Sequence, residues 1–264
     1  MEYSTNQYSA SKFSPYRKAS ADLLTAANRK NMVHALLEVD IEATRKAIRK
    51  LRKEKKKYLS LIGYIVYCTA RAVDQDKRMH AYRDWRNRLI SFKEVDVSTT
   101  IEREIGGERE VIPKIIRNAN HKDMFEISSE IQRAKTAEIE DEEVYKSIRA
   151  YLAIPVFIRR WIFRMLDRFP LLMKKKAGTI MVTSAGTGGV HRAWGIPVAS
   201  HTLNIAIGGV GTERYQINDQ TVSSEHLCLT VSFDHNIIDG APASRFVRSF
   251  VKIIESEIFS ENLS

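Results

Sequence analysis

The chain has 264 residues, 44% hydrophobic and 28% charged, without low-complexity tracts or repeats, so it can bury a sizeable core in one or two domains. Its net charge of +10 favours anionic partners: nucleic acid, a membrane surface or a phosphorylated cofactor. No helix-turn-helix, zinc-finger spacing or RNP-type aromatic motif accompanies the basic runs, so we expect no nucleic-acid partner.

The N-terminal third alternates between helical and extended patterns. Residues 1–14 are rich in Ser, Tyr and Asn and lack an apolar core, which predicts a flexible segment without an export signal. A helix is predicted for 16–30, and a strand for 31–40. A basic helix over 41–56, whose charges we expect to be solvated, and a largely buried helix over 60–74 follow.

Two strands and a helix are predicted next. The strands cover 89–100 and 110–117, with a turn at Gly106-Gly107. An apolar stripe that includes Met124, Ile127 and Ile131 predicts a helix over 123–136.

The segment 143–176 has an amphipathic, basic character. Within it, residues 151–172 are long and apolar enough for a membrane span, but several charged side chains interrupt them, and charge at mid-bilayer is costly. Arg160, Arg164 and Arg168 repeat at i, i+4, which predicts one amphipathic helix with Phe157 and Trp161 on other faces. Two interpretations stay open: a helix packed on its own or a neighbouring subunit, or an interfacial membrane helix or acyl-chain cover.

The C-terminal third is rich in strands and ends in a helix. Strands are predicted for 179–184, 202–210 and 226–233, and a helix for 240–259. The irregular alternation of strands and helices predicts an α/β protein with a mixed sheet covered by helices.

Cysteine and histidine usage argues against disulfides and metal. Cys68 and Cys228 lie in apolar patterns, which predicts buried free thiols and a cytoplasmic location. His191 and His201 lack metal-ligand neighbours, so we expect structural or exposed side chains and no metal site.

The residues best suited to chemistry follow the strand over 226–233. His235 leaves this strand, and Asp239-Gly240 then opens the last helix. Such a turn can expose one imidazole nitrogen, and histidine can take a proton from a thiol or hydroxyl near neutral pH.

The sequence SFDHNIIDGAPASRF over 232–246 closely resembles the end of the catalytic domain of the 2-oxo acid dehydrogenase E2 acyltransferases, which share a fold with chloramphenicol acetyltransferase. The resemblance starts near residue 15 and covers most of the chain. Its other blocks, in the family's order, are YRKA at 16–19, LEVD at 37–40, VIPKII at 111–116, NANHKDMFEI at 118–127 and GTIMVTSAG at 178–186.

This resemblance implies roles for individual residues. His235 would be the general base, and Thr183 would donate a hydrogen bond to the tetrahedral oxyanion. Asp239, in the motif that Gly240 completes, would form a structural pair with Arg17. Ser184 follows Thr183 and points to the opposite face of an extended strand.

The resemblance also implies a homotrimer. The histidine of one subunit would face the hydroxyl strand of the next, in a channel that coenzyme A enters from one end and the acceptor from the other. The phosphates of coenzyme A suit a basic chain.

Three departures from the family pattern stand out. The chain shows no lipoyl domain or peripheral-subunit-binding domain, so we expect no covalently bound lipoyl group, with residues 15–264 forming one catalytic domain. Asn236 stands where the complex-forming enzymes usually have arginine. The segment 143–176 and the loop 188–200 have no clear counterpart. Trp194 in that loop is a candidate for the acceptor pocket, and so is Ser184 on the preceding strand. The alternative for the loop is packing on the protein surface.

Three functions remain open. The first is a stand-alone acyltransferase that uses acyl-CoA and an unidentified thiol, hydroxyl or amine acceptor, with a lipid-like group suggested by the apolar face of 143–176. The second is an E2 core subunit that uses separate lipoyl proteins. The third is a non-catalytic trimeric scaffold. The sequence argues against it, because it keeps all the motif residues: His235, Thr183, Asp239 and Gly240.

Overall fold

The computed structural model describes residues 15–27, 30–105, 108–137, 146, 150–184, 191–198, 200–217 and 220–260. The predicted segment 1–14 and the predicted turn Gly106-Gly107 lie outside the described residues, as does most of 138–149, where the segment 143–176 begins. The helices are α1 (Pro15–Ala27), α2 (Glu42–Glu54), α3 (Leu61–Gln75), α4 (Met124–Thr136), α6 (Val156–Arg168), α7 (Pro170–Ala177) and α8 (Gly240–Ser260). The strands are β1 (Met32–Asp40), β2 (Tyr82–Arg83), β3 (Leu89–Ile90), β4 (Val97–Ile105), β5 (Glu108–Ile116), β6 (Ile180–Ser184), β7 (Leu203–Ile217) and β8 (Gln220–Asp234).

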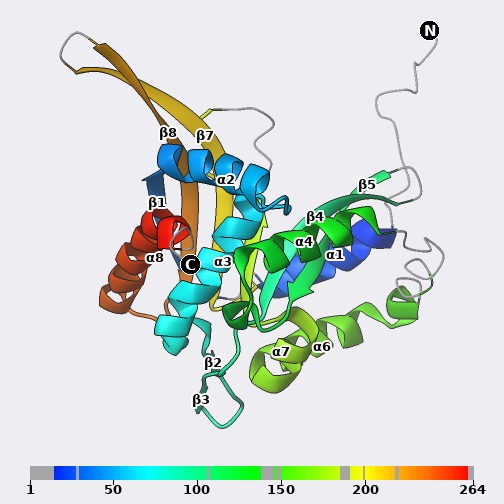
Figure 1. The fold of residues 1–264 in the computed structure, drawn as a ribbon. Coiled ribbons are helices and arrows are strands. Elements are labelled where there is room, and N and C mark those ends of the chain that lie inside the picture. The colour runs from blue at the N-terminus through cyan, green and yellow to red at the C-terminus, as the bar shows by residue number, and fades with distance from the viewer. Residues whose placement is uncertain are drawn as a thin grey trace, which may run out of the picture.

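A six-stranded mixed sheet in the order β1-β8-β7-β6-β4-β5 forms the frame of the molecule (Figure 1). The pairs β1–β8, β7–β8 and β4–β5 are antiparallel, whereas β6 pairs parallel with both β4 and β7. Strands β2 and β3 form a separate hairpin. The predicted mixed sheet with helices is therefore confirmed.

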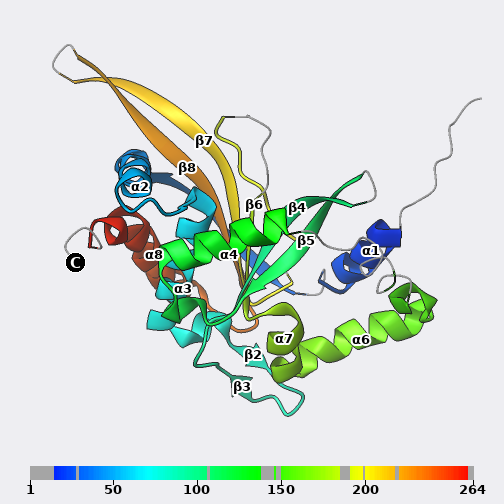
Figure 2. The same cartoon turned by 45° about the vertical axis from the view of Figure 1, so that its right-hand side comes forward.

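Helices α2, α3, α4 and α8 gather on one side of the sheet, and α1, α6 and α7 lie together beside its β4–β5 end (Figures 1 and 2). Helix α3 has the most buried sequence of the layer, and Ser60 caps it by accepting a hydrogen bond from the Gly63 amide at 3.0 Å. Helix α4 begins with a capping box between Asp123 and Glu126. Side chains from both layers form one core, among them Val39, Leu51, Tyr64, Ile65, Met124, Ile127, Val182, Leu229, Val231, Phe233 and Phe250.

Among the described residues no such helix layer covers the opposite face of the sheet, which we call the open face. Thr183 pairs with Ala206, Ala206 with Thr230, and Thr230 with Leu36, so these four residues share a row on this face. The loop 191–198 lies across part of it, with the Gly209 amide donating to the Ala193 carbonyl at 2.8 Å. A Cβ at Gly208 would lie 2.2 Å from that oxygen, so glycine permits the close approach.

Three predicted elements have different bounds in the structure. The strand predicted for 89–100 is wrong over 91–96, because side chains rather than a strand partner satisfy this backbone: Asn120 accepts from the Val95 amide and His80 bonds to the Phe92 carbonyl. Strands β7 and β8 extend well beyond the predicted strands, because their polar outer halves pair with each other as a long hairpin.

The helix predicted for 151–172 is divided. Residues 151–153 are helical, Pro155 precedes α6, and Phe169 separates α6 from α7, which starts at Pro170. Proline fits the first turn of a helix but lacks the amide that a continuous helix needs, so the chain turns at both prolines. Among the described residues, no helix is long and apolar enough to cross a bilayer.

Candidate active site

His235 lies at the tip of a short turn that connects β8 to α8. Its amide donates to the Asn31 carbonyl at 2.7 Å, which extends the pairing of β1 with β8 by one bond. The Ile237 and Ile238 amides both donate to the Asp234 carbonyl, at 2.9 and 3.0 Å. The backbone of the predicted general base is therefore held on both sides.

Polar side chains beneath the turn fix its shape. The Asp234 carboxylate is buried and accepts from the Asn236 amide at 3.1 Å and from its Nδ2 at 2.8 Å. Asn31 Nδ2 donates to Asn236 Oδ1 at 3.0 Å, and Lys30 Nζ lies 3.7 Å from the Asp234 carboxylate. Asn236, which departs from the family pattern, thus holds the turn. Lys30, Asn31 and Asp234 share this role, and the sequence alone did not predict it for any of the four residues.

The side chains of His235 and Asp239 face solvent. The His235 side chain is 48% exposed, and its Nδ1 lies 4.0 Å from Oδ1 of Asp239, which is 85% exposed. This distance is too long for a hydrogen bond but allows an ion pair when the imidazole is protonated. A Cβ at Gly240 would have no neighbour within 4 Å, so close packing within the chain does not require this glycine.

Thr183 lies on β6 and faces the open face of the sheet. Its Oγ1 is 2.8 Å from Thr100 Oγ1 on β4, and its side chain is half-buried. The neighbouring Val182 points into the core on the other face, and Ser184 is exposed. The alternation along the strand thus puts the Thr183 hydroxyl, rather than that of Ser184, on the open face.

Within one chain, the His235 and Thr183 side chains lie far apart. Thr183 is separated from Thr230 by one intervening strand, and His235 lies five residues beyond Thr230 on β8. Strand spacing and rise place the two residues roughly 10 Å apart across the sheet and roughly 17 Å along it. The distance is too large for both to contact one reacting carbon within a single chain.

Arg17 and Asp239 are also carried by different parts of the molecule. Arg17 is an exposed residue in the first turns of α1, whereas Asp239 immediately precedes α8. Figures 1 and 2 place α1 beside β4 and β5, whereas α8 lies near β1 at the other end of the sheet. Asp239 lies beside His235, and the expected Arg17 pair stays a prediction.

Trp194 fastens the loop 191–198 to the sheet. Its Nε1 donates to the Leu37 carbonyl at 2.9 Å, and its side chain is 36% exposed. The loop also bonds to β7 through Ala193. These contacts support surface packing of the loop, while the acceptor-pocket role of Trp194 and Ser184 stays a prediction.

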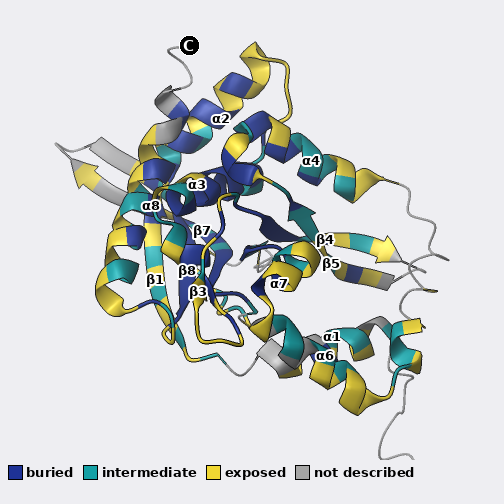
Figure 3. Cartoon of the chain, turned by 90° about the horizontal axis from the view of Figure 1, so that it is seen from below, coloured by how far each residue is buried: buried dark blue, intermediate teal, exposed yellow. Residues whose placement is uncertain are grey.

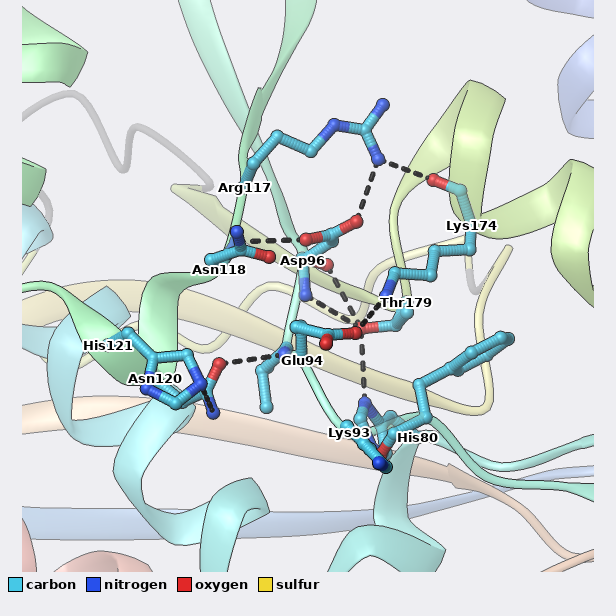
Figure 4. A network of polar contacts seen from close by, with 12 residues as sticks. His80, Lys93, Glu94, Asp96, Arg117, Asn118, Asn120, His121, Lys174 and Thr179 are labelled. Atoms are coloured by element: carbon cyan, nitrogen blue, oxygen red, sulfur yellow. Dashed lines mark hydrogen bonds and ion pairs between the residues drawn. The ribbon is translucent and has the colours of Figure 1, made fainter.

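A buried polar network positions the start of β6 (Figure 4). Asp96 accepts from Arg117 Nη1 at 2.8 Å, from the Asn118 amide at 2.9 Å and, through its carbonyl, from the Thr179 amide at 2.7 Å. Arg117 also donates to the carbonyls of Lys174 and Lys175 at the end of α7. The network joins β4, β5 and β6 to α7, four residues before Thr183.

Two buried histidines serve structure. His80 bonds to Thr179 Oγ1 and the Phe92 carbonyl, and His201 bonds to the Ala177 carbonyl and Ser200 Oγ. Burial lowers the pKa of each to about 4. His191 is exposed, and Cys68 and Cys228 are buried free thiols, which confirms that prediction. Within the described residues no group of three or more His, Cys, Asp or Glu could hold a metal ion.

Comparison with known proteins identifies the family. The family model of the 2-oxoacid dehydrogenases acyltransferase (catalytic domain) matches residues 5–144 and 173–259. The chain belongs to this family. Residues 145–172, between the two matched ranges, fall within the predicted insertion.

Relatives of this acyltransferase family agree with the sequence resemblance. The dihydrolipoyllysine-residue acetyltransferase component of the pyruvate dehydrogenase complex of Rickettsia felis is 22% identical over 209 residues, which are 77% of this chain and 42% of that protein. The chain thus spans less than half the length of this relative.

Solved structures agree on the fold. A probable dihydrolipoamide acetyltransferase from Listeria monocytogenes superimposes with a TM-score of 0.68 at 17% identity, covering 94% of this chain and 95% of that one. Chloramphenicol acetyltransferase superimposes with a TM-score of 0.51 at 12% identity, covering 90% and 95%. The predicted chloramphenicol acetyltransferase-like fold is confirmed.

Proposed function

We propose that this chain is an acyltransferase that moves an acyl group between coenzyme A and a thiol, hydroxyl or amine acceptor. The observation that carries the proposal is His235, exposed on a turn held by hydrogen bonds from its backbone amides and to the Asp234 carboxylate. An exposed imidazole on a rigid turn suits general-base chemistry, because the proton-accepting nitrogen stays in one place while the substrate approaches.

In the proposed reaction, the His235 imidazole removes the proton of the acceptor as the acceptor attacks the thioester carbon of acyl-CoA. The carbonyl oxygen becomes an oxyanion, and the Thr183 hydroxyl of a neighbouring copy donates a hydrogen bond to it. Collapse of the intermediate breaks the carbon–sulfur bond, and the thiol of coenzyme A leaves with the proton from the imidazolium. Thr100 supports this role, because it can donate to Thr183 Oγ1 and leave the Thr183 proton for the oxyanion.

The proposed active unit is a homotrimer. Support comes from the separation of His235 and Thr183 within one chain, which a second copy would resolve. The open face also exposes Leu36 (55%) and Val111 (56%), apolar side chains that a neighbouring subunit would cover. In this arrangement the pair between Asp239 and Arg17 would form across the subunit contact.

A second candidate is an E2 core subunit that acylates lipoyl groups on separate proteins. It is favoured by the Rickettsia felis relative, which is a component of a pyruvate dehydrogenase complex. For either candidate, we propose that the described part of the chain carries no covalently bound lipoyl group. The buried free thiols support a reducing, cytoplasmic compartment for either candidate.

The test is the release of free coenzyme A thiol from acyl-CoA in the presence of dihydrolipoamide, simple alcohols or amines. We expect turnover by the wild-type protein and its loss in His235→Ala, while His191→Ala, which removes another exposed histidine, retains activity. A His235→Ala rate equal to wild type would exclude the mechanism. Transfer only to dihydrolipoamide would favour the core-subunit candidate, and transfer to alcohols or amines the stand-alone enzyme.

A further inference from the structure

Large apolar side chains gather on the outer side of α6, α7 and the β2–β3 turn. They form, with the basic residues between them, what we call the basic–aromatic patch. Seen from below, α6, α7 and the hairpin at β3 all carry exposed residues (Figure 3). The exposed apolar members are Trp85 (56%), Leu89 (53%), Phe157 (71%), Trp161 (56%), Phe169 (38%), Leu171 (74%) and Leu172 (40%).

The two parts of the patch, which are distant in sequence, meet at the end of α6. The Trp85 amide donates to the Arg168 carbonyl at 3.1 Å, which joins the β2–β3 turn to the end of α6. Figures 1 and 2 show the hairpin beside α6 and α7 at the lower end of the molecule. Phe157, Trp161 and Arg168 fall within one side of α6, because residues four and seven positions apart share a helix face.

The structure corrects the expected distribution of side chains on α6. The prediction placed Phe157 and Trp161 away from the arginine stripe, whereas both are exposed beside Arg160 and Arg168, which are exposed as well. The packed side of α6 instead carries Arg159, whose Nε lies 3.0 Å from the buried Asp22 carboxylate of α1. Aromatic and basic side chains are therefore interleaved on the solvent side.

The charge of the patch is strongly positive. Residues 83–89 and 156–177 together contain ten Lys or Arg and two Asp, and of the ten, Arg159 and Lys174 pair with Asp22 and Glu94 outside these ranges. Of the two Asp within the ranges, Asp84 is buried and paired with Arg88 at 2.8 Å. The Arg86 guanidinium lies 4.5 Å from the Trp85 ring centroid, so it can accompany the ring to a shared surface.

We propose that the basic–aromatic patch docks the protein on an anionic lipid membrane. Tryptophan and phenylalanine partition to the headgroup level, leucine enters the acyl boundary, and Lys and Arg bind anionic headgroups. Since no helix among the described residues is long and apolar enough to span a bilayer, the helices lie on the membrane surface. A second copy is a poor occupant, because two strongly positive patches repel each other.

Docking would bring the candidate active site to the membrane. Lys30 Nζ lies 5.9 Å from the ring centroid of Tyr82 on β2, and the same ammonium pairs with Asp234, the residue before His235. This consequence rests on the proposed function, whereas docking does not. The segment 145–172, which contains all of α6, lies outside the ranges that the family model matches.

Flotation of the full chain with vesicles tests the proposal without any activity measurement. We expect binding to vesicles of phosphatidylcholine with phosphatidylglycerol, little binding to phosphatidylcholine alone, and release as salt rises and screens the charges. Phe157→Ser with Trp161→Ser should weaken binding at least about tenfold. The matched control Ile196→Ser with Val198→Ser removes two similarly exposed apolar side chains (63% and 51%) elsewhere and should bind as wild type.

Charge reversals provide the second comparison. Lys175→Glu with Lys176→Glu should weaken binding at least about tenfold. Arg49→Glu with Lys53→Glu changes as many exposed charges on α2, away from the aromatics, and should have little effect. Equal losses from both pairs would show attraction by net charge alone and would overturn the proposal, as would no binding of the wild type at low salt.

Tryptophan emission reports the same event without disturbing the patch. The chain has three Trp, and Trp194→Phe leaves only Trp85 and Trp161. Anionic vesicles should shift the emission of this variant to shorter wavelength. An unshifted emission, or patch variants that change the oligomeric state rather than vesicle binding, would instead indicate a protein contact and contradict membrane docking.

Discussion

Thr183 Oγ1 lies 2.8 Å from Thr100 Oγ1, so the proposed oxyanion donor is held by a hydroxyl on the neighbouring strand. Either hydroxyl can donate, but only a proton on Thr183 that points away from Thr100 is available to an oxyanion. Thr183 can therefore serve as the oxyanion donor only when Thr100 is the donor in the bond between the two hydroxyls.

Thr183→Val should lower kcat on the order of 10²–10³-fold, because it removes the hydroxyl and keeps the branched shape of the side chain. Thr183→Ser should retain most of the activity. Steady-state transfer from acyl-CoA measures both variants. Equal rates for Val and wild type would remove Thr183 from the mechanism.

Thr100→Val should lower kcat less, about five- to tenfold, because Thr183 keeps its proton but loses the group that orients it. KM for acyl-CoA should change little, because we expect Thr100 to act on Thr183 through their hydrogen bond rather than on acyl-CoA. A loss as large as that of Thr183→Val would mean that Thr100 itself is the donor, and an increase in KM alone would indicate a binding role.

The two buried histidines should make the protein less stable in acid. Their folded pKa of about 4 lies below the ordinary value of 6.5, so the unfolded chain binds more protons between these limits. Stability should therefore fall as pH falls from about 6.5 to about 4, by up to about 3 kcal/mol for each histidine. Urea unfolding at several pH values measures this slope.

A variant isolates the contribution of one histidine. His201→Asn should reduce the slope of unfolding free energy against pH by up to about 1.4 kcal/mol per unit, which is the effect of one proton. An unchanged slope would mean that His201 does not titrate differently on unfolding.

Gly178→Ala should destabilise the junction between α7 and β6. Gly178 has φ +84°, and a Cβ there would lie 2.8 Å from the Asp96 carbonyl, the acceptor of the Thr179 amide. We expect a loss of about 2 kcal/mol or more in unfolding free energy. Gly240→Ala is the control, expected within about 0.5 kcal/mol, because its Cβ would meet no neighbour within 4 Å. Equal losses would contradict this.

The sequence predicted the type and order of most elements, because their apolar periodicity is local. The strand bounds that depend on pairing between distant residues became apparent only in the structure. The polar halves of β7 and β8 are strands because they pair with each other. Similarly, the irregular segment 91–96 depends on bonds to Asn120 and His80, which are distant in sequence, and no local pattern reveals such bonds.

In the candidate site, too, local motifs could be predicted from the sequence and long-range contacts could not. His235 is found from a motif and its resemblance, and the structure places it on a turn held by Asn31 and Asp234. Asn236 is a departure in sequence, yet its two bonds to Asp234 become apparent only in three dimensions.

The central claim is that one active site takes His235 from one chain and Thr183 from another. The most direct test is to co-express His235→Ala chains with Thr183→Val chains and to measure the acyl transfer of the mixed oligomer. Random trimers should regain about one quarter of wild-type activity, because some sites pair an intact His235 with an intact Thr183. Mixed oligomers no more active than either parent would contradict the account.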